Sequence, residues 1–477
     1  MDAATLSVCT PELVLSLGAL AVLLLGALFG PKATGALSLV SGAVLIGAAF
    51  AAALGPLGAP FHGAFVMDAT ARYSKLAIYI AAAVGVVLGY GWLRRSGQPK
   101  FEYPVLILLA TLGMSMMVSA ADLISLYISI ELQSLALYVL AAFQRDDAKS
   151  SEAGLKYFVL GALSSGLLLY GASLIYGFAG SMRFSDIAAA THGGAHVGEI
   201  FGLIFLICGI AFKVSAAPFH MWTPDVYEGA PTPVVAFVAA APKLAAMVLF
   251  ARTLDQAFPG ALPQWRGVVI ILAVISFVVG GFGGLVQKDF KRLLAYSSIA
   301  NIGYALLAIA AGTSMGIQAM LVFMVLYMID VTGFFACLEA LKRDGKPIVL
   351  ISDLAGLKRE RPGIALALTA LSLSVLGMPP FSGFWGKYFV FMSALHVDGL
   401  WPYAIAGLLA SVVAAFYYLR VIKLMWFDPA PAKVDRAPAE ARWIGYACAL
   451  FAFPVVVVAL MWLTPAAEAA SRSLGLH

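Results

Sequence analysis

Charged residues are scarce in this sequence. Asp, Glu, Lys and Arg make up 12% of the 477 residues, whereas a soluble domain carries about 25%. Hydrophobic residues reach 62%, which excludes an ordinary water-soluble globular protein. The formal net charge is +5, but the cations form no basic face and lie in short connections between apolar runs. This distribution argues against nucleic acid as a partner and is typical of a multi-pass membrane protein in a lipid bilayer.

Cysteine is rare as well. Cys9, Cys208, Cys337 and Cys448 are scattered and form no CxxC pair, so the sequence predicts neither an iron–sulfur cluster nor a zinc site. It also lacks a GxxxxGK[ST] phosphate loop and a strand followed by GxGxxG. We therefore expect no metal, nucleotide or redox cofactor on this chain. The energy for any transport must come from an ion gradient or from partner subunits.

Apolar runs long enough to cross a bilayer, about 20 residues each, tile the whole chain. They predict an all-α polytopic membrane protein with about fourteen transmembrane helices and no soluble domain. The N-terminus lacks the basic region of a cleaved signal peptide, so we expect the first run to remain as a helix. The expected helices cover residues 11–29, 34–54, 70–93, 103–119, 121–143, 153–178, 200–221, 231–252, 266–286, 291–311, 316–341, 364–392, 401–427 and 442–463.

Lys and Arg concentrate in alternate connections, and the opposite connections offer little beyond Arg183, Arg252 and Arg266. The positive-inside rule makes the rich connections cytoplasmic. Both termini are then expected on the periplasmic side of a bacterial cytoplasmic (inner) membrane. The rich connections carry Arg94, Arg95 and Lys100; Arg145 and Lys149; Lys288, Lys291 and Arg292; Lys342, Arg343, Lys346, Lys358, Arg359 and Arg361; and Lys423, Lys433, Arg436 and Arg442.

Proline interrupts two of the expected helices, at residues 217–218 and at residues 377–380. Proline removes a backbone donor, and irregular backbone at membrane depth is tolerated only against protein or water. Two such breaks in corresponding positions of two halves indicate a transporter with inverted repeats. We expect helices 1–3 in residues 1–102, a first five-helix repeat (helices 4–8) in 103–255, a second (helices 9–13) in 256–430, and helix 14 in 431–477.

Three lysines, Lys213, Lys243 and Lys387, lie in or beside apolar runs without a neutralising neighbour. A lysine near the centre of a membrane helix costs about 2.5–3.5 kcal/mol on insertion scales, so such residues usually face a bundle interior or a water path. Glu131, in a fourth apolar run, is the natural partner carboxylate. Burial favours the neutral form of a lysine and a nearby carboxylate favours the charged form, so moving the partner would switch the proton. The alternatives are a structural counter-ion or snorkelling for the lysines, and an interhelical hydrogen bond for Glu131.

Three further titratable residues have two interpretations each. Lys156 either takes part in the same path or forms a helix-end pair with Glu152, four residues earlier. His220, beside the first break, is either a proton relay or a hydrogen-bonded packing residue. Asp330 is a buried-looking carboxylate, for which a hydrogen-bonded or protonated acid is the alternative. The nearby residues Asp225, Tyr227 and Glu228 are expected to lie in a loop and to shape it.

Three motifs together resemble the antiporter-like membrane subunits of respiratory complex I. They are HMWTPDVYEGAPTPV (220–234), KDFKRLLAYSSIANIGY (288–304) and GMPPFSGFWGKYFVF (377–391). PDVYEGAP and the earlier ELQSL (131–135) resemble subunit N of NADH:quinone oxidoreductase rather than its longer paralogues. The resemblance implies two inverted five-helix repeats, each with one broken helix. It implies as partners the antiporter-like paralogues and small membrane subunits of the complex, with an indirect link to the peripheral redox arm.

The resemblance also implies roles for single residues. Glu131 and Lys213 would be the charged pair of one half-channel, Lys243 the central relay, and Lys387 the lysine of the second half-channel. Lys156 would support the first half-channel. The family often has histidine where this chain has Asn301, which cannot titrate. Asp330 is a candidate to compensate for that difference.

The leading hypothesis is a proton-translocating subunit driven by redox chemistry in partner subunits of a quinone reductase. The alternative is a subunit of an Mrp-type cation/proton antiporter, for which a sequence like HxWLPxAHxEAP would be expected after the first break; the observed DVYEGAP disfavours it. A third hypothesis, a purely structural membrane scaffold, is disfavoured because lysines lie at both breaks.

Overall fold

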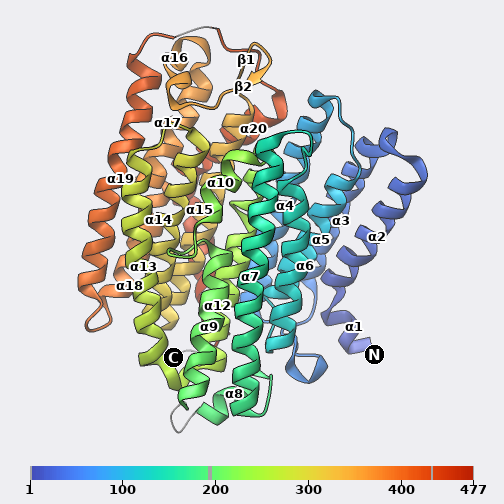
Figure 1. The fold of residues 1–477 in the computed structure, drawn as a ribbon, viewed down its shortest axis with the longest axis vertical. Helices are drawn as coiled ribbons and strands as arrows, with labels where there is room; N and C mark the ends of the chain where they lie inside the picture. Colours follow the sequence, from blue (N-terminus) through green and yellow to red (C-terminus); the bar gives the residue numbers. More distant parts are fainter. Residues whose placement is uncertain (1–2, 192–195, 431–432, 476–477) are drawn as a thin grey trace.

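The structure, a computed structural model, describes residues 3–191, 196–430 and 433–475. It is a bundle of helices that run nearly along the long axis of the molecule (Figure 1). Within the described ranges, twelve helical stretches are long and apolar enough to cross a membrane. Two shorter apolar helices, α5 and α17, complete the set, with α18 continuing α17 beyond a break. The expected all-α polytopic fold of about fourteen transmembrane helices is confirmed.

Short helices and turns separate the long helices, and several expected spans consist of two helices in succession. The helices are α1 (Ala3–Val8), α2 (Thr10–Phe29), α3 (Thr34–Leu54), α4 (Ala69–Ser96), α5 (Glu102–Met117), α6 (Leu123–Ala141), α7 (Ala148–Ala179), α8 (Phe184–Thr191), α9 (Val197–Val214), α10 (Trp222–Gly229), α11 (Thr232–Val238), α12 (Ala241–Ala257), α13 (Leu262–Leu285), α14 (Phe290–Ala310), α15 (Ser314–Glu339), α16 (Leu357–Glu360), α17 (Pro362–Leu376), α18 (Ser382–Leu395), α19 (Trp401–Phe427), α20 (Ala439–Leu450) and α21 (Val456–Arg472).

A small hairpin lies at one end of the bundle. Its strands, β1 (Lys342–Arg343) and β2 (Lys346–Pro347), are antiparallel, with Lys342 opposite Pro347. In Figure 1 the hairpin and α16 lie at the upper end, whereas the marks for the two chain ends lie in the lower part. The connection that holds the hairpin also holds many of the basic residues counted in the sequence. The first and last described residues therefore lie on the side of the bundle opposite to this basic connection.

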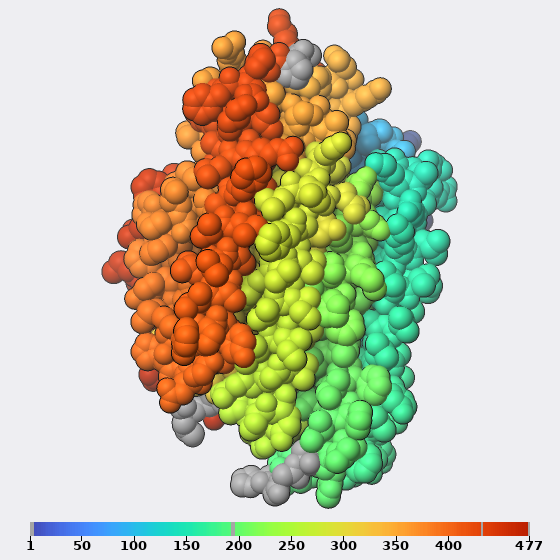
Figure 2. Space-filling view, turned by 60° about the vertical axis from the view of Figure 1, so that its left-hand side comes forward, coloured from blue at the N-terminus to red at the C-terminus, as the bar shows by residue number. Residues whose placement is uncertain are grey.

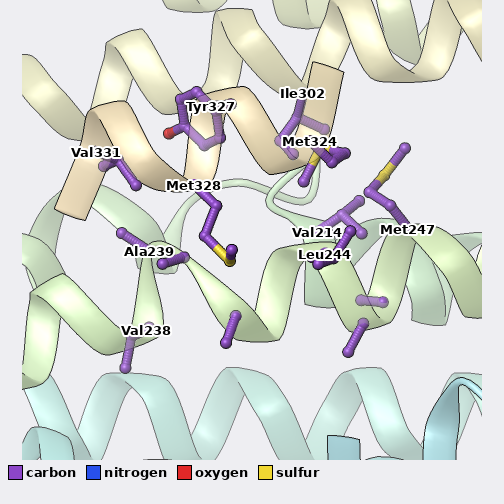
Figure 3. Close-up of a cluster of buried hydrophobic side chains, with 14 of the residues drawn as sticks. Val214, Val238, Ala239, Leu244, Met247, Ile302, Met324, Tyr327, Met328 and Val331 are labelled. Atoms are coloured by element: carbon purple, nitrogen blue, oxygen red, sulfur yellow. The ribbon is translucent and has the colours of Figure 1, made fainter. Parts of the chain in front are cut away.

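The centre of the bundle is the α11–α12 pair, which is enclosed on all sides. Helix α15 packs alongside this pair, and the side chains of Leu244, Met247, Met324 and Met328 fill the space between them (Figure 3). The outer helices α7, α9, α13 and α19 lie next to one another on the face shown in Figure 2. These outer helices expose many large apolar side chains, as expected of a surface that meets lipid or other membrane subunits.

Both expected breaks are present. Helix α9 ends at Val214 and α10 begins at Trp222, while α17 ends at Leu376 and α18 begins at Ser382. In each case the first residue after the helix has a left-handed backbone, with φ of +68° at Ser215 and +91° at Gly377. These residues stop the helix because its hydrogen-bond pattern cannot continue through a positive φ.

Two interruptions were not predicted. The expected helix 231–252 separates into α11 and α12 at residues 239–240, where Ala240 has φ −105° and ψ −92°. The expected helix 442–463 is interrupted between α20 and α21, where Phe453 is extended and precedes Pro454. Pro242, in the first turn of α12, and Pro454 were the available sequence signals.

The stretch after the first break is helical, so Asp225, Tyr227 and Glu228 lie in α10 and the loop expected there was wrong. Pro224 lies in the first turn of α10, where the missing N–H of a proline costs no helical hydrogen bond.

Candidate functional site

The first break carries Lys213 in the last turn of α9, with 7% of the residue exposed. Its Nζ donates to Ser134 Oγ at 2.9 Å and to Tyr138 OH at 3.3 Å. Both hydroxyls belong to α6, and their spacing of four residues places them on one face of that helix. The positive charge of Lys213 is therefore met by two neutral hydroxyl groups.

Glu131 lies on the same face of α6, three residues before Ser134. Its carboxylate is half-buried and accepts a hydrogen bond from Ser165 on α7. In the part of the chain that the structure describes, the hydrogen-bond partners of Lys213 are hydroxyls, and Glu131 makes no ion pair with it. Glu131 thus shares one face of α6 with Ser134, an acceptor of Lys213, and the Glu131 carboxylate is not in direct contact with the lysine.

Lys156 lies in a cluster of charged side chains at the ends of α7, α10 and α14. Its Nζ is 2.7 Å from Glu152 Oε1 and 2.7 Å from Asp225 Oδ2. The helix-end pair with Glu152 is thus present, and Asp225 is a second partner across helices. Arg292 contacts both Asp225, at 2.7 Å, and Glu228, at 2.9 Å. The cluster surrounds a cavity of about 170 Å³ and joins three helices at one end of the bundle.

His220 lies in the irregular segment between α9 and α10, and its ring is half-buried. Its Nδ1 atom has no hydrogen-bond partner among the described residues. The same segment is held by Ala217 N, which donates to Ser276 Oγ of α13 at 2.9 Å, and by Trp222 Nε1, which donates to the Phe212 carbonyl at 2.9 Å. The break is thus fixed by its neighbours, and these contacts do not involve the histidine ring.

Lys243 lies in the first turn of α12, directly after the unexpected interruption, and is 1% exposed. Its Nζ donates to Ser298 Oγ of α14. The ring of Tyr227 lies 5.4 Å from the Lys243 ammonium group, and the Tyr227 hydroxyl is 3.5 Å from Ser298 Oγ. Lys243 therefore contacts α14, a helix of the second expected repeat.

Asn301 follows Ser298 by one turn on α14, so the two side chains share a face of that helix. The Asn301 amide donates to the Ser297 carbonyl at 2.9 Å. Ser297 in turn is hydrogen-bonded to the Tyr418 hydroxyl. Polar groups thus continue along α14 from Lys243 towards the second break.

The second break carries Lys387 in α18, with 6% of the residue exposed. Its Nζ donates to Ser411 Oγ of α19 at 2.8 Å and to the Leu376 carbonyl at 3.0 Å. That carbonyl is the last of α17, and the break leaves it free to accept this bond. The ring of Tyr304 lies 4.7 Å from the Lys387 ammonium group, so this lysine too is held by neutral groups.

Asp330 of α15 supports the same break and is 1% exposed. Ser374 Oγ, at the end of α17, donates to it at 2.7 Å, and Ser382 Oγ, at the start of α18, donates at 3.1 Å. The Gly383 N–H donates to Ser374 Oγ at 2.9 Å. Asp330 is therefore a hydrogen-bonded acid, as one interpretation of the sequence expected, and it connects the two sides of the break.

One further buried lysine was not predicted from the sequence, and it is held by a carboxylate. Lys75 of α4 is fully buried, and its Nζ lies 2.7 Å from Glu12 Oε1 of α2. Ser115 Oγ of α5 donates to the same carboxylate oxygen. The signal was available, because Lys75 lies in the expected span 70–93 and Glu12 lies in the span 11–29. Within the described ranges, no three His, Cys, Asp or Glu side chains gather where they could hold a metal ion.

Comparisons with known proteins show the family and the fold of the chain. Residues 120–414 match the family model described as NADH:quinone oxidoreductase/Mrp antiporter, transmembrane. The chain is 67% identical over 391 residues to NADH-quinone oxidoreductase subunit N of Caulobacter sp. (strain K31), which covers 80% of this chain and 81% of the relative.

Two solved structures share the fold. A chain of respiratory complex I from Thermus thermophilus is similar with a TM-score of 0.82 and 33% identity, covering 96% of this chain and 99% of that one. A chain of the Mrp complex from Dietzia sp. DQ12-45-1b has a TM-score of 0.83 and covers 99% and 98%, but its identity is 20%, so it shows the fold alone.

Proposed function

Because this chain belongs to the NADH-quinone oxidoreductase subunit N family, within the antiporter-like membrane subunits, we propose that it translocates protons as a membrane subunit of such an enzyme. One observation carries the proposal. Each of Lys213, Lys243 and Lys387 is buried beside an interrupted helix and is bonded to neutral groups. A lysine held in this way can lose its proton without leaving a contacting carboxylate unpaired.

The proposed path runs from the charged cluster around Lys156, past Glu131 to Lys213, on to Lys243, and then to Lys387. His220 is a candidate relay at the first break. We propose that the path uses no cofactor on this chain and that redox chemistry in partner subunits drives it. The residue ranges 103–255 and 256–430 are proposed as the two inverted repeats, each containing one of the two proline breaks.

The orientation follows from charge. The proposed location is the bacterial cytoplasmic membrane, with the basic connections in the cytoplasm and both termini in the periplasm. The hairpin β1–β2 and α16 would then face the cytoplasm. The other antiporter-like subunits and the small membrane subunits of the enzyme are the proposed partners, with the peripheral redox arm connected indirectly.

The test uses the assembled enzyme in sealed vesicles. Lys213→Ala and Lys243→Ala are each expected to abolish most of the proton pumping that accompanies NADH:quinone turnover, because each removes a proton-binding group from a single path. Lys346→Ala, an exposed lysine of β2, is the matched control and should pump normally. Undiminished pumping in both Lys213→Ala and Lys243→Ala, with normal assembly, would contradict the proposal.

The same assay separates the two ion chemistries. The description of the family model that matches residues 120–414 includes Mrp antiporters, so a cation/proton antiporter is the second candidate. Pumping that continues at full rate in a sodium-free medium supports proton translocation, whereas a strict requirement for sodium would favour the antiporter.

A further inference from the structure

Asp330 and Lys387 line one small cavity at the second break. Its volume is about 10 Å³, and its lining includes Asn301 and Tyr327 as well as these two charged residues. A cavity holds one water molecule when it reaches about 10–15 Å³ and offers polar partners. This cavity meets both conditions at their lower limit. Asp330 and Lys387, two residues of opposite charge in the second expected repeat, therefore line a cavity that is large enough for a single water molecule.

We propose that Asp330 is a proton-exchange residue of the second half and that it exchanges protons with Lys387 through this cavity. The inference rests on the proposed function and adds a residue to it. It also explains how the second half can work with Asn301, which cannot titrate: the Asp330 carboxyl group lines the same cavity and can carry the proton.

Electrostatics makes the pair favourable. A charge buried in a membrane protein needs a compensating charge or a full set of hydrogen bonds. Asp330 accepts hydrogen bonds from Ser374 and Ser382, but among the described residues it makes no ion pair. Lys387 is the only cation among the residues that line its cavity. Each of the two residues is thus the opposite charge available to the other.

The exchange conserves charge within the cavity. A proton leaves Nζ of the Lys387 ammonium group, passes through the water, and binds one oxygen of the Asp330 carboxylate. One N–H bond breaks and one O–H bond forms, and no electrons are transferred. The two opposite charges on the cavity lining become a neutral amine and a neutral acid, so the net charge of the site is unchanged. The step therefore avoids creating an isolated charge in a low-dielectric region.

The cavity also connects Lys387 with the central lysine. Lys243 donates to Ser298 of α14. Tyr327 lines the cavity, as does Asn301, one turn after Ser298 on α14. The α14 face that carries Ser298 and Asn301 therefore leads from Lys243 to the Asp330–Lys387 cavity.

The experiment measures protons pumped per NADH oxidised in vesicles that contain the assembled enzyme. Asp330→Asn is expected to lower this ratio as much as Lys387→Met does, because either change removes one member of the exchanging pair. Asp255→Asn removes a buried carboxylate of α12 that lies outside the cavity and should keep the normal ratio. Adding Asn301→His to Asp330→Asn restores a titratable group to the same lining and should raise the ratio again.

The outcomes separate the two proposals. A normal ratio in Asp330→Asn together with a lowered ratio in Lys387→Met overturns the role of Asp330 and leaves the proposed function standing. A normal ratio in both variants contradicts the proposed use of the second half. Should Asp330→Asn fail to assemble, Asp330→Leu takes its place, since leucine has the same branching as aspartate but binds no proton, and Ser374 and Ser382 also bond to each other at 2.7 Å. A normal ratio in that variant likewise overturns the role of Asp330.

Discussion

The chain buries lysines in two regions, and it holds them differently. In the N-terminal helices, Lys75 contacts the Glu12 carboxylate at 2.7 Å. In the helices around the breaks, Lys213, Lys243 and Lys387 donate to hydroxyls and, for Lys387, also to a carbonyl. All four residues are at most 7% exposed, so burial alone does not distinguish them.

The difference lies in what deprotonation would leave behind. A neutral Lys75 would leave the Glu12 carboxylate buried without its contacting cation, and breaking a buried ion pair in this way is costly. A neutral Lys243 would leave a serine hydroxyl, which can turn and donate instead. We infer that the contact ion pair fixes the N-terminal helices to one another, while the hydroxyl-bonded lysines are free to change their protonation state.

The largest effect on stability is expected from Lys75→Met. It leaves Glu12 as an unpaired buried charge, and loss of one partner of a buried pair costs about 3–5 kcal/mol. The thermal midpoint of the purified enzyme, or assembly of the subunit, measures the effect. The double variant Lys75→Met/Glu12→Gln removes both charges and should recover most of the loss. A single variant as stable as the parent would refute the structural role of this pair.

A smaller loss is expected from Ser298→Ala. It removes the acceptor of the Lys243 ammonium group, and an unsatisfied buried polar group costs about 1–3 kcal/mol. The same thermal midpoint reports it. Adding Lys243→Met to Ser298→Ala should reduce the loss, because no charge then remains to be satisfied. If the losses in the two single variants simply added up in the double variant, the contact between Lys243 and Ser298 would not contribute to the free energy of unfolding.

Lys243→Met should change stability less than Ser298→Ala does, while it stops most of the pumping. Methionine has a similar length and no charge, so the change removes a buried ammonium group and leaves only a serine hydroxyl, which can turn to another partner. The comparison of thermal midpoint with proton pumping in one preparation is therefore decisive. A large loss of stability with pumping retained would place Lys243 in the same class as Lys75.

The smallest effect on stability is expected from Lys156→Met. The Lys156 side chain is 42% exposed, and exposed ion pairs contribute about 0–1 kcal/mol. Lys149→Met, in the same cluster and 67% exposed, is the matched control for stability. Both midpoints should lie close to that of the parent, so a selective decrease of pumping in Lys156→Met would assign it to the path.

Much of the fold was readable from the sequence, because a membrane helix needs an apolar run of fixed length and the runs are long. The prolines at residues 218 and 379–380 located two breaks, because a proline inside a helix removes a backbone hydrogen-bond donor. The interruption between α11 and α12 was missed, because Pro242 lies in the first turn of a helix and produces no break in the apolar pattern.

The partners of the site residues were less predictable. Lys213 contacts Ser134 and Tyr138, and Asp330 contacts Ser374 and Ser382, across helices that are distant in sequence. Such contacts depend on how the helices pack, and neither periodicity nor composition specifies it. Lys75 was missed although the rule applied to Lys213 also applies to it, which shows that a buried lysine indicates function only once its partner is known.

The interruptions also create helix ends inside the membrane, and helix ends are polarised. The backbone dipoles of a helix place partial negative charge at its last turn and partial positive charge at its first turn, each worth about 0.3–1 kcal/mol to a nearby ion. Lys213 occupies the last turn of α9 and Lys243 the first turn of α12. The backbone therefore favours a cation at Lys213 and disfavours one at Lys243. Two chemically identical side chains therefore differ in the free energy of carrying a positive charge. The helix ends supply this difference without any charged side chain.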